Sequence, residues 1–116
     1  MLFGLFARKE DKILSRIGVD VHSHLIPEID DGAKDYEISL LCIREIVKQG
    51  VKKIYITPHF QTRRFNNDED DVRLRFEELK VKVADAKIDV DMQLAGEYLI
   101  DDGFRARMES DKKFLA

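Results

Sequence analysis

The chain has 116 residues, with 20 Lys or Arg, 23 Asp or Glu and a formal net charge of −3. This composition describes one globular unit and excludes collagen-like, low-complexity and disulfide-framework proteins. A slightly negative charge also argues against a nucleic-acid-binding protein, which would carry an excess of Lys and Arg on one face. The single cysteine, Cys42, fits a reducing compartment, so we expect a cytoplasmic protein.

Residues 1–16 are expected to form an amphipathic lead-in to the domain. Their apolar run, residues 1–7, has no basic residues before it and is followed directly by charged residues. A secretory signal would begin with its positive charges and a membrane span needs about 20 apolar residues, so we expect no stable membrane insertion. The side chains available for packing against the domain or a neighbouring chain are Leu5, Phe6, Lys9, Ile13 and Ile17. A disordered or membrane-surface segment is the alternative.

The rest of the chain alternates between strand and helix patterns. Residues 17–25 alternate apolar and polar side chains with the period of a strand, and residues 35–49 place Leu40, Ile43 and Val47 on one face of a helix that stops at Gly50. Strand periodicity returns at residues 51–59. This order favours βαβ units and a parallel sheet.

The second half repeats the pattern. Residues 68–86 carry a helical apolar stripe, Val72, Phe76, Leu79 and Val83, behind an acidic run, Asp68 to Asp71, that is expected to be a solvated helix start. Residues 89–99 again alternate like a strand, and a further helix is expected to begin within residues 101–110. No linker divides the chain into separate domains.

The histidines lie where the strands are predicted to end. His22 and His24 are one residue apart on a strand and therefore project from one face, where two imidazoles can reach one metal ion. Asp30 and Asp31, before Gly32, can return toward that face through a turn. Taken alone, the histidine pair is weak evidence, because strand-end histidines also simply hydrogen-bond to their neighbours.

Two further candidate ligands strengthen this interpretation. His59 closes the second predicted strand and Glu97 closes the third. Because the carboxyl ends of parallel strands meet at one rim, the three segments deliver their side chains to one place. The sequence therefore predicts a metal centre at that rim.

The motifs resemble a known family. Residues 20–35, Asp-Val-His-Ser-His-Leu-Ile-Pro-Glu-Ile-Asp-Asp-Gly-Ala-Lys-Asp, together with Thr57-Pro58-His59 and Gly96-Glu97, are similar to the polymerase and histidinol phosphatase (PHP) superfamily, specifically its bacterial capsule-associated protein-tyrosine phosphatases. The resemblance runs from about Gly18 to Leu115. It implies an α/β fold in which residues 17–116 are the N-terminal portion of a distorted (βα)7 TIM-like barrel with parallel strands.

The resemblance also implies a metal site and a substrate. The positions that match family metal ligands are His22, His24, Asp31, His59 and Glu97, and Glu97 bridges two metals in the family. The implied cofactor is Mn²⁺, two or three ions in the complete enzyme, and the implied catalytic group is a metal-bound water positioned by these residues. The implied partner is the phosphotyrosine tail of a bacterial tyrosine kinase that controls capsule or exopolysaccharide synthesis.

Later family motifs, a further His, an Asp-x-His pair and phosphate-binding arginines, would lie beyond residue 116, so the C-terminal part of the domain is expected to be absent. We therefore expect residues 1–116 alone to show little or no phosphatase activity. The outer edge of the third strand and apolar side chains such as Leu94 are expected to be uncovered, which favours association with another chain, including a second copy.

The sequence also allows a cysteine mechanism, a substrate-binding arginine pair and other functions to be considered. A cysteine-dependent phosphatase uses a C-x5-R loop, but Lys48 stands six residues after Cys42, which is expected to be buried on the apolar side of a helix. Arg63 and Arg64 are the basic pair nearest the predicted site and can orient phosphotyrosine, with simple solvent exposure as the alternative. Phe65 is expected to face the core. Hydrolysis of a small ester such as histidinol phosphate, and a non-catalytic fragment that binds metal or another chain, remain as alternative functions.

Overall fold

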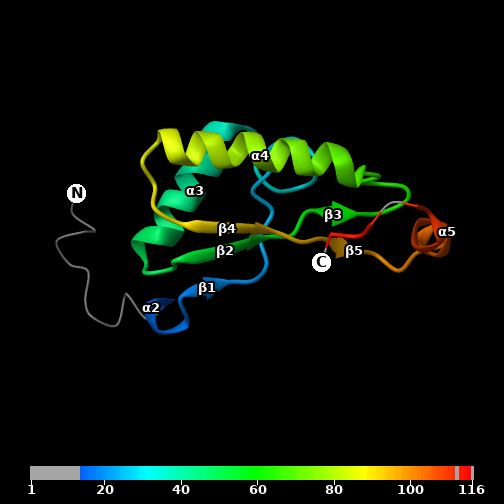
Figure 1. The fold of residues 1–116 in the computed structure, drawn as a ribbon, viewed down its shortest axis with the longest axis horizontal. Coiled ribbons are helices and arrows are strands. Elements are labelled where there is room, and N and C mark those ends of the chain that lie inside the picture. The colour runs from blue at the N-terminus through cyan, green and yellow to red at the C-terminus, as the bar shows by residue number, and fades with distance from the viewer. Residues whose placement is uncertain (1–13, 112, 116) are drawn as a thin grey trace.

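The computed structural model describes residues 14–111 and 113–115 and shows a mixed α/β arrangement (Figure 1). The elements, in chain order, are α2 (Leu14–Ile17), β1 (Val19–Asp20), α3 (Tyr36–Lys48), β2 (Lys53–Ile56), β3 (His59–Phe60), α4 (Glu69–Asp85), β4 (Asp91–Leu94), β5 (Glu97–Tyr98) and α5 (Phe104–Glu109). Among the described helices, none is long and apolar enough to cross a membrane.

The strands form two short parallel sheets. β1, β2 and β4 form the first sheet in that order, with Ile54 paired to Met92 in the β2–β4 register. β3 and β5 form the second, in which His59 is paired with Glu97 and Phe60 with Tyr98. The predicted parallel pairing is confirmed, and the second sheet sets two candidate metal ligands side by side.

Both long helices begin at an aspartate. The carboxylate of Asp35 accepts a hydrogen bond from the Ile38 amide at 2.8 Å, and that of Asp68 accepts one from the Asp71 amide at 3.1 Å. Such caps satisfy amides that the first helical turn leaves without a partner. α3 ends before Gly50, whose φ of 107° lies in the left-handed region that favours glycine. The predicted helices over residues 35–49 and 68–86 are confirmed.

The hydrophobic core lies between these two helices and the three-stranded sheet, on the side of the sheet that α3 and α4 cover in Figure 1. The predicted stripe of α4 is fully engaged, since Val72, Phe76, Leu79 and Val83 are all buried. The sheet contributes Ile54, Ile56 and Met92 from its covered face, and α3 contributes Ile43. The core therefore holds the strands in register beneath the site.

The strands are shorter than the sequence predicts. Regular pairing in residues 17–25 is limited to β1, and residues 14–17 form the short helix α2. Residues 51–59 are split at Thr57-Pro58, because proline has no amide hydrogen for the ladder, and residues 89–99 are split at Ala95-Gly96. His59 and Glu97 therefore begin new strands, and the prediction that they close long ones is wrong.

Three predicted side-chain environments are also wrong. Ile17 is 66% exposed, so it does not pack against the domain, while the other packing residues proposed for the lead-in lie outside the described residues. Cys42 is exposed, not buried. Within the acidic start of α4, Glu69 is 2% exposed, because it is paired with Arg107 of α5 at 2.6 Å.

β4 pairs with β2, and no described strand pairs with its other edge. Beside β4 lies a groove whose lining combines the polar side chains of Arg73, Glu77, Lys80 and Gln93 with the apolar side chains of Phe76, Met92, Leu94, Phe114 and Leu115. Leu94 is half-buried there. The expected open edge of the third predicted strand is thus present in the part of the chain that the structure describes.

Candidate metal centre

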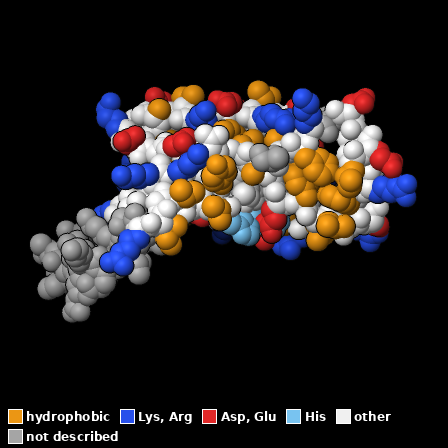
Figure 2. Space-filling model, turned by 60° about the horizontal axis from the view of Figure 1, so that its bottom comes forward, with side chains coloured by type: hydrophobic (Ala, Val, Ile, Leu, Met, Phe, Trp, Pro, Cys, Tyr) orange, Lys and Arg blue, Asp and Glu red, His pale blue; other side chains and the backbone are white. Residues whose placement is uncertain are grey.

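The predicted ligands come from four separate places in the chain and meet beyond the carboxyl ends of the first sheet. His22 and His24 follow β1, Asp30 and Asp31 lie in the loop before α3, His59 begins β3 and Glu97 begins β5. On the face of the molecule seen in Figure 2, histidine and acidic side chains reach the surface next to each other. The sequence prediction that these segments converge is confirmed by the geometry.

One group of ligand atoms surrounds a single carboxylate oxygen. Glu97 Oε2 lies 3.0 Å from His22 Nε2 and 3.1 Å from His24 Nε2. The two histidine Nε2 atoms are themselves 3.2 Å apart. Two imidazole nitrogens and one carboxylate oxygen thus point at one another. This arrangement suits a cation that all three atoms could coordinate.

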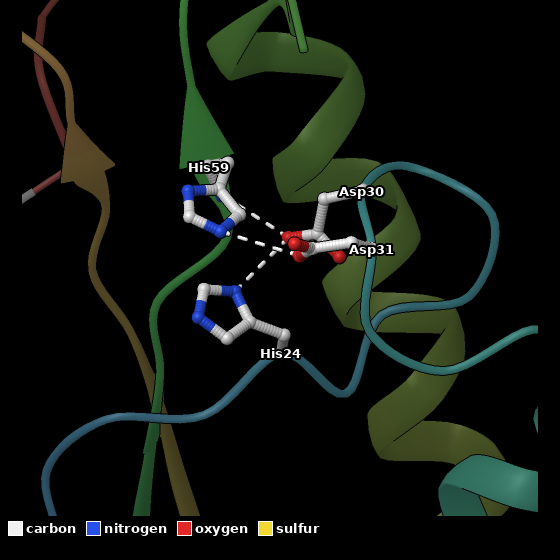
Figure 3. Close-up of side chains that lie close together, drawn as sticks. All are labelled: His24, Asp30, Asp31 and His59. Atoms are coloured by element: carbon white, nitrogen blue, oxygen red, sulfur yellow. Dashed lines mark hydrogen bonds and ion pairs between the residues drawn. The ribbon is translucent and has the colours of Figure 1, made fainter. Parts of the chain in front are cut away.

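A second group adjoins the first through His24 (Figure 3). His24 Nδ1 lies 3.1 Å from Asp30 Oδ2, and His59 Nε2 lies 3.3 Å from Asp31 Oδ1. The rings of His24 and His59 are stacked, with centroids 4.4 Å apart and an interplanar angle of 13°. His59 Nδ1 also lies 3.4 Å from Glu97 Oε2, which joins the two groups.

Nitrogen and carboxylate donors of this kind fit a divalent transition metal. One set of possible ligand atoms comes from His24, Asp30, Asp31 and His59, and another from His22, His24 and Glu97; within each set the atoms lie within 4.8 Å of one another. Imidazole and carboxylate ligands together suit first-row divalent ions, including Mn²⁺. The donor set therefore fits a metal, and the geometry alone leaves its identity open.

The loop that carries Asp30 and Asp31 folds tightly against His24. The Ala33 amide donates a hydrogen bond to the His24 carbonyl at 3.0 Å. A Cβ atom at Gly32 would lie 2.1 Å from the same carbonyl oxygen, so only glycine fits at this close approach. The Asp-Asp-Gly motif thus brings both carboxylates back to the histidines.

Two residues at the site make contacts that the sequence did not predict: Asp30, which the sequence grouped with Asp31 as a carboxylate pair, and Asn67, which it gave no role. Asp30, whose side chain is 1% exposed, accepts hydrogen bonds from the amides of Gly32 and His59. Asn67, in the loop before α4, donates from its carboxamide to the carbonyls of Ile29 and His59. Only the adjacency of Asp30 to Asp31 hinted at the first, and no pattern in the sequence pointed to the second.

The two arginines differ in their relation to the site. Arg63 pairs with Asp102 and its side chain is 82% exposed. The Arg64 guanidinium lies 4.7 Å from the centre of the Phe65 ring, and that ring stacks on His59 with centroids 5.3 Å apart. Phe65 is thus half-buried against the site instead of facing the core as expected, and it connects Arg64 to a candidate ligand.

The loop after β3 is fastened to the segment after β5 by Asp101. Its carboxylate accepts hydrogen bonds from the Thr62 amide and the Thr62 hydroxyl, both at 2.7 Å, and one from the Gly103 amide at 3.1 Å. Because these bonds favour the ionised form, they lower the pKa of Asp101, the Thr62 amide contributing most. This connection fixes the loop that carries Arg63, Arg64 and Phe65.

The model of the family described as "Capsular polysaccharide synthesis, CpsB/CapC" matches residues 18–115. The chain belongs to the CpsB/CapC family. The matched residues contain every candidate ligand named above. The resemblance noted from the motifs is thereby confirmed at the level of the family.

Individual CpsB/CapC proteins support the assignment. The chain is 29% identical over 84 residues to CapC of Staphylococcus aureus, covering 72% of this chain and 33% of that protein. It is 39% identical over 62 residues to the tyrosine-protein phosphatase CpsB of Streptococcus agalactiae serotype V, covering 53% of this chain and 26% of that protein. The chain thus matches about a quarter to a third of the length of these relatives.

The fold is also similar to a solved structure. The match is to one of the crystal structures of YwqE from Bacillus subtilis and CpsB from Streptococcus pneumoniae, which are described as metal-dependent tyrosine phosphatases. The TM-score is 0.70 at 27% sequence identity, over 78% of this chain and 37% of that one. A metal-dependent relative agrees with the donor set found at the rim.

Proposed function

We propose that this chain carries the N-terminal part of a metal-dependent protein-tyrosine phosphatase. The observation that supports it most is the convergence of three imidazoles with the carboxylates of Asp31 and Glu97 at the rim. They fall into two groups, and within each group the possible ligand atoms lie within 4.8 Å of one another. The family match and the metal-dependent tyrosine phosphatases with this fold supply the reaction class. In this proposal β1, β2 and β4 are the first strands of a distorted (βα)7 barrel.

The proposed metal ligands are His22, His24, Asp31, His59 and Glu97, with Mn²⁺ as the proposed metal. A bound divalent cation supplies an activated water near neutral pH and neutralises phosphate oxygens during hydrolysis of a phosphomonoester. The chain's part is to fix the ligand atoms, since the parallel pairing of His59 with Glu97 sets two of them in register. We propose that the complete protein holds two or three ions and acts in the cytoplasm.

Cysteine chemistry plays no part in this proposal. Cys42 is exposed on α3, and the candidate ligands lie on the loops and strand starts at the rim. The residue six positions later is Lys48, so a thiolate formed here lacks the arginine of a phosphate-binding loop. Hydrolysis therefore rests on the His and carboxylate groups.

The proposed substrate is phosphotyrosine in the tail of a bacterial tyrosine kinase that controls capsule or exopolysaccharide synthesis. Arg64, held over Phe65 beside His59, is the basic side chain placed to receive the phosphorylated residue or its acidic flanks. Arg63 is proposed to assist only when its pair with Asp102 opens. An aromatic and a guanidinium surface next to the site favours an aryl phosphate over a small aliphatic ester.

The test uses a chimera in which residues 18–115 replace the matching segment of B. subtilis YwqE, so that the rest of the enzyme is supplied. With Mn²⁺, the chimera is expected to hydrolyse a phosphotyrosine peptide faster than histidinol phosphate, and a chelator is expected to abolish both activities. Residues 1–116 alone are expected to show little or no turnover. A folded chimera that is inactive with Mn²⁺, or equally active after chelation, would contradict the proposal.

A further inference from the structure

β3 is a two-residue strand with a hydrogen-bonded neighbour on one side only in the described chain. β5 occupies that side, where the Glu97 amide donates to the Pro58 carbonyl at 2.9 Å and the Leu99 amide to the Phe60 carbonyl at 3.0 Å. The amide and carbonyl of His59 point to the other side. In a sheet that side would receive another strand, because a buried backbone group needs a partner.

Side chains take the place of that strand at His59. Asp30 Oδ2 accepts the hydrogen bond of the His59 amide at 3.1 Å, and Asn67 Nδ2 donates to the His59 carbonyl at 2.7 Å. The backbone of this candidate ligand is therefore held before and after its Cα atom. Both partners come from loops outside the β3–β5 sheet.

The same two side chains hold the loop that carries Asp31. Asn67 Nδ2 also donates to the carbonyl of Ile29 at 3.0 Å, and Asp30 Oδ1 accepts from the Gly32 amide at 3.0 Å. Asp30 Oδ2 also lies 3.1 Å from His24 Nδ1; because an ionised carboxylate can only accept a hydrogen bond, we assign the ring proton to Nδ1, which leaves Nε2 facing Glu97. Asp30 and Asn67 therefore hydrogen-bond to the loop that carries Asp31 and to the backbone of His59, and Asp30 also contacts the His24 ring.

Neither side chain is placed to serve freely as a ligand itself. The Asp30 side chain is 1% exposed, and both of its oxygens are already hydrogen-bonded to donors of the chain. The Asn67 Nδ2 group donates to two backbone carbonyls, which holds this carboxamide against the backbone of Ile29 and His59. Asp31, by contrast, has a side chain that is 50% exposed and lies next to His59 Nε2.

From this geometry we propose that Asp30 and Asn67 are positioning residues of the metal centre. Together they fix the spacing of His24, Asp31 and His59 without touching the metal. The inference rests on the proposed metal site for its function, whereas the hydrogen bonds of Asp30 and Asn67 can be tested without a metal. Partners of this kind orient metal ligands, and their removal typically lowers metal affinity about 10- to 100-fold.

The test replaces each side chain with one of similar size that lacks the required group. Asp30→Asn keeps an oxygen for one amide but presents an NH2 group to His59 or His24, and Asn67→Leu removes both donors. The matched control is Asn66→Leu, because Asn66 is the exposed neighbour whose side chain meets Arg107 and not His59.

The first readout is hydrogen exchange of the His59 amide in the metal-free 116-residue protein, followed by NMR relative to Ile54 in the core. Asp30→Asn is expected to speed exchange at His59 about tenfold or more, the loss expected for a hydrogen bond to a charged acceptor, with Ile54 unchanged. The second readout is the ¹⁵N signature of the His24 ring, which should move away from the Nδ1–H form in Asp30→Asn but not in Asn67→Leu.

The third readout is Mn²⁺ affinity by calorimetry, expected to fall about 10- to 100-fold in both variants and to stay unchanged in the control. His59 exchange, His24 signature and Mn²⁺ affinity that match the control in both variants would overturn the proposal. If Asp30→Asn does not fold, a matching result in Asn67→Leu alone overturns it. Failure of the unaltered protein to bind Mn²⁺ would contradict the proposed function. The hydrogen-exchange result tests the positioning role of Asp30 and Asn67 separately.

Discussion

The buried ion pair between Arg107 and Glu69 allows a quantitative test of its contribution to the free energy of unfolding. The Arg107 guanidinium bonds to Glu69 Oε1 at 2.6 Å, and the two side chains are 15% and 3% exposed. It also donates to the Asn67 carbonyl at 3.2 Å and lies over the rings of Phe60 and Tyr98, 5.4 Å and 6.0 Å from their centres. Arg107→Ala would leave the Glu69 carboxylate buried without its cation.

The expected cost follows from that burial. Removing one partner of a buried ion pair destabilises a protein by about 3–5 kcal/mol, because the remaining charge stays desolvated. A chain of this size is stable by about 6–17 kcal/mol, so the variant should remain folded at 25 °C but lose a large part of its stability. With a urea m-value of about 1–3 kcal/mol/M, its unfolding midpoint should fall by at least about 1 M.

A matched control lies on the same helix. Arg105 pairs with Glu109 at 3.0 Å, but the side chains are 88% and 65% exposed, so Arg105→Ala should cost less than about 0.5 kcal/mol. Replacing both Glu69 and Arg107 with Met should recover much of the lost stability, because no unpaired charge remains. Equal urea midpoints for Arg107→Ala and Arg105→Ala would refute the reasoning.

Three further predictions concern the site and its surroundings. In the YwqE chimera, Cys42→Ala should keep the turnover of the parent, whereas chelation should remove it; the opposite pattern would restore the cysteine mechanism. Arg64→Ala should raise KM for a phosphotyrosine peptide several-fold with kcat nearly unchanged, and the exposed Arg44→Ala should change neither; equal effects would remove Arg64 from substrate binding. Leu94→Lys should reduce association of residues 1–116 measured by light scattering, since it places a charge among the apolar side chains of the groove beside β4; unchanged association would exclude that surface.

The helices could be predicted because their signals are local. The α4 stripe of Val72, Phe76, Leu79 and Val83 follows the helical period, and a capping aspartate precedes each long helix. The burial of Cys42 was predicted wrongly because neighbouring residues on a helix point about 100° apart. Ile43 points into the core and is fully buried, whereas Cys42 points away from the core and is exposed. Periodicity does not fix where a narrow buried stripe is centred.

The convergence of the site could also be predicted, since parallel strands deliver their ends to one rim. The strand breaks at Pro58 and Gly96, which turn His59 and Glu97 into the first residues of new strands, were not apparent from alternation alone. The roles of Asp30 and Asn67 depend on hydrogen bonds between residues far apart in the sequence. Asp30 and His59 are 29 residues apart, Asn67 and His59 are 8 apart, and Asn67 and Ile29 are 38 apart. Such contacts exist only once the loops have met.

His24 is the residue on which the central claim can be tested most directly, because it contributes a possible ligand atom to both groups at the rim. The measurement is a Mn²⁺ titration of the 116-residue protein, in which electron paramagnetic resonance reports the free ion. The unaltered protein is predicted to bind Mn²⁺, and His24→Ala is predicted to lose that binding while Cys42→Ala retains it. Binding by His24→Ala with the affinity and stoichiometry of the unaltered protein would contradict the assignment of this rim as the metal centre.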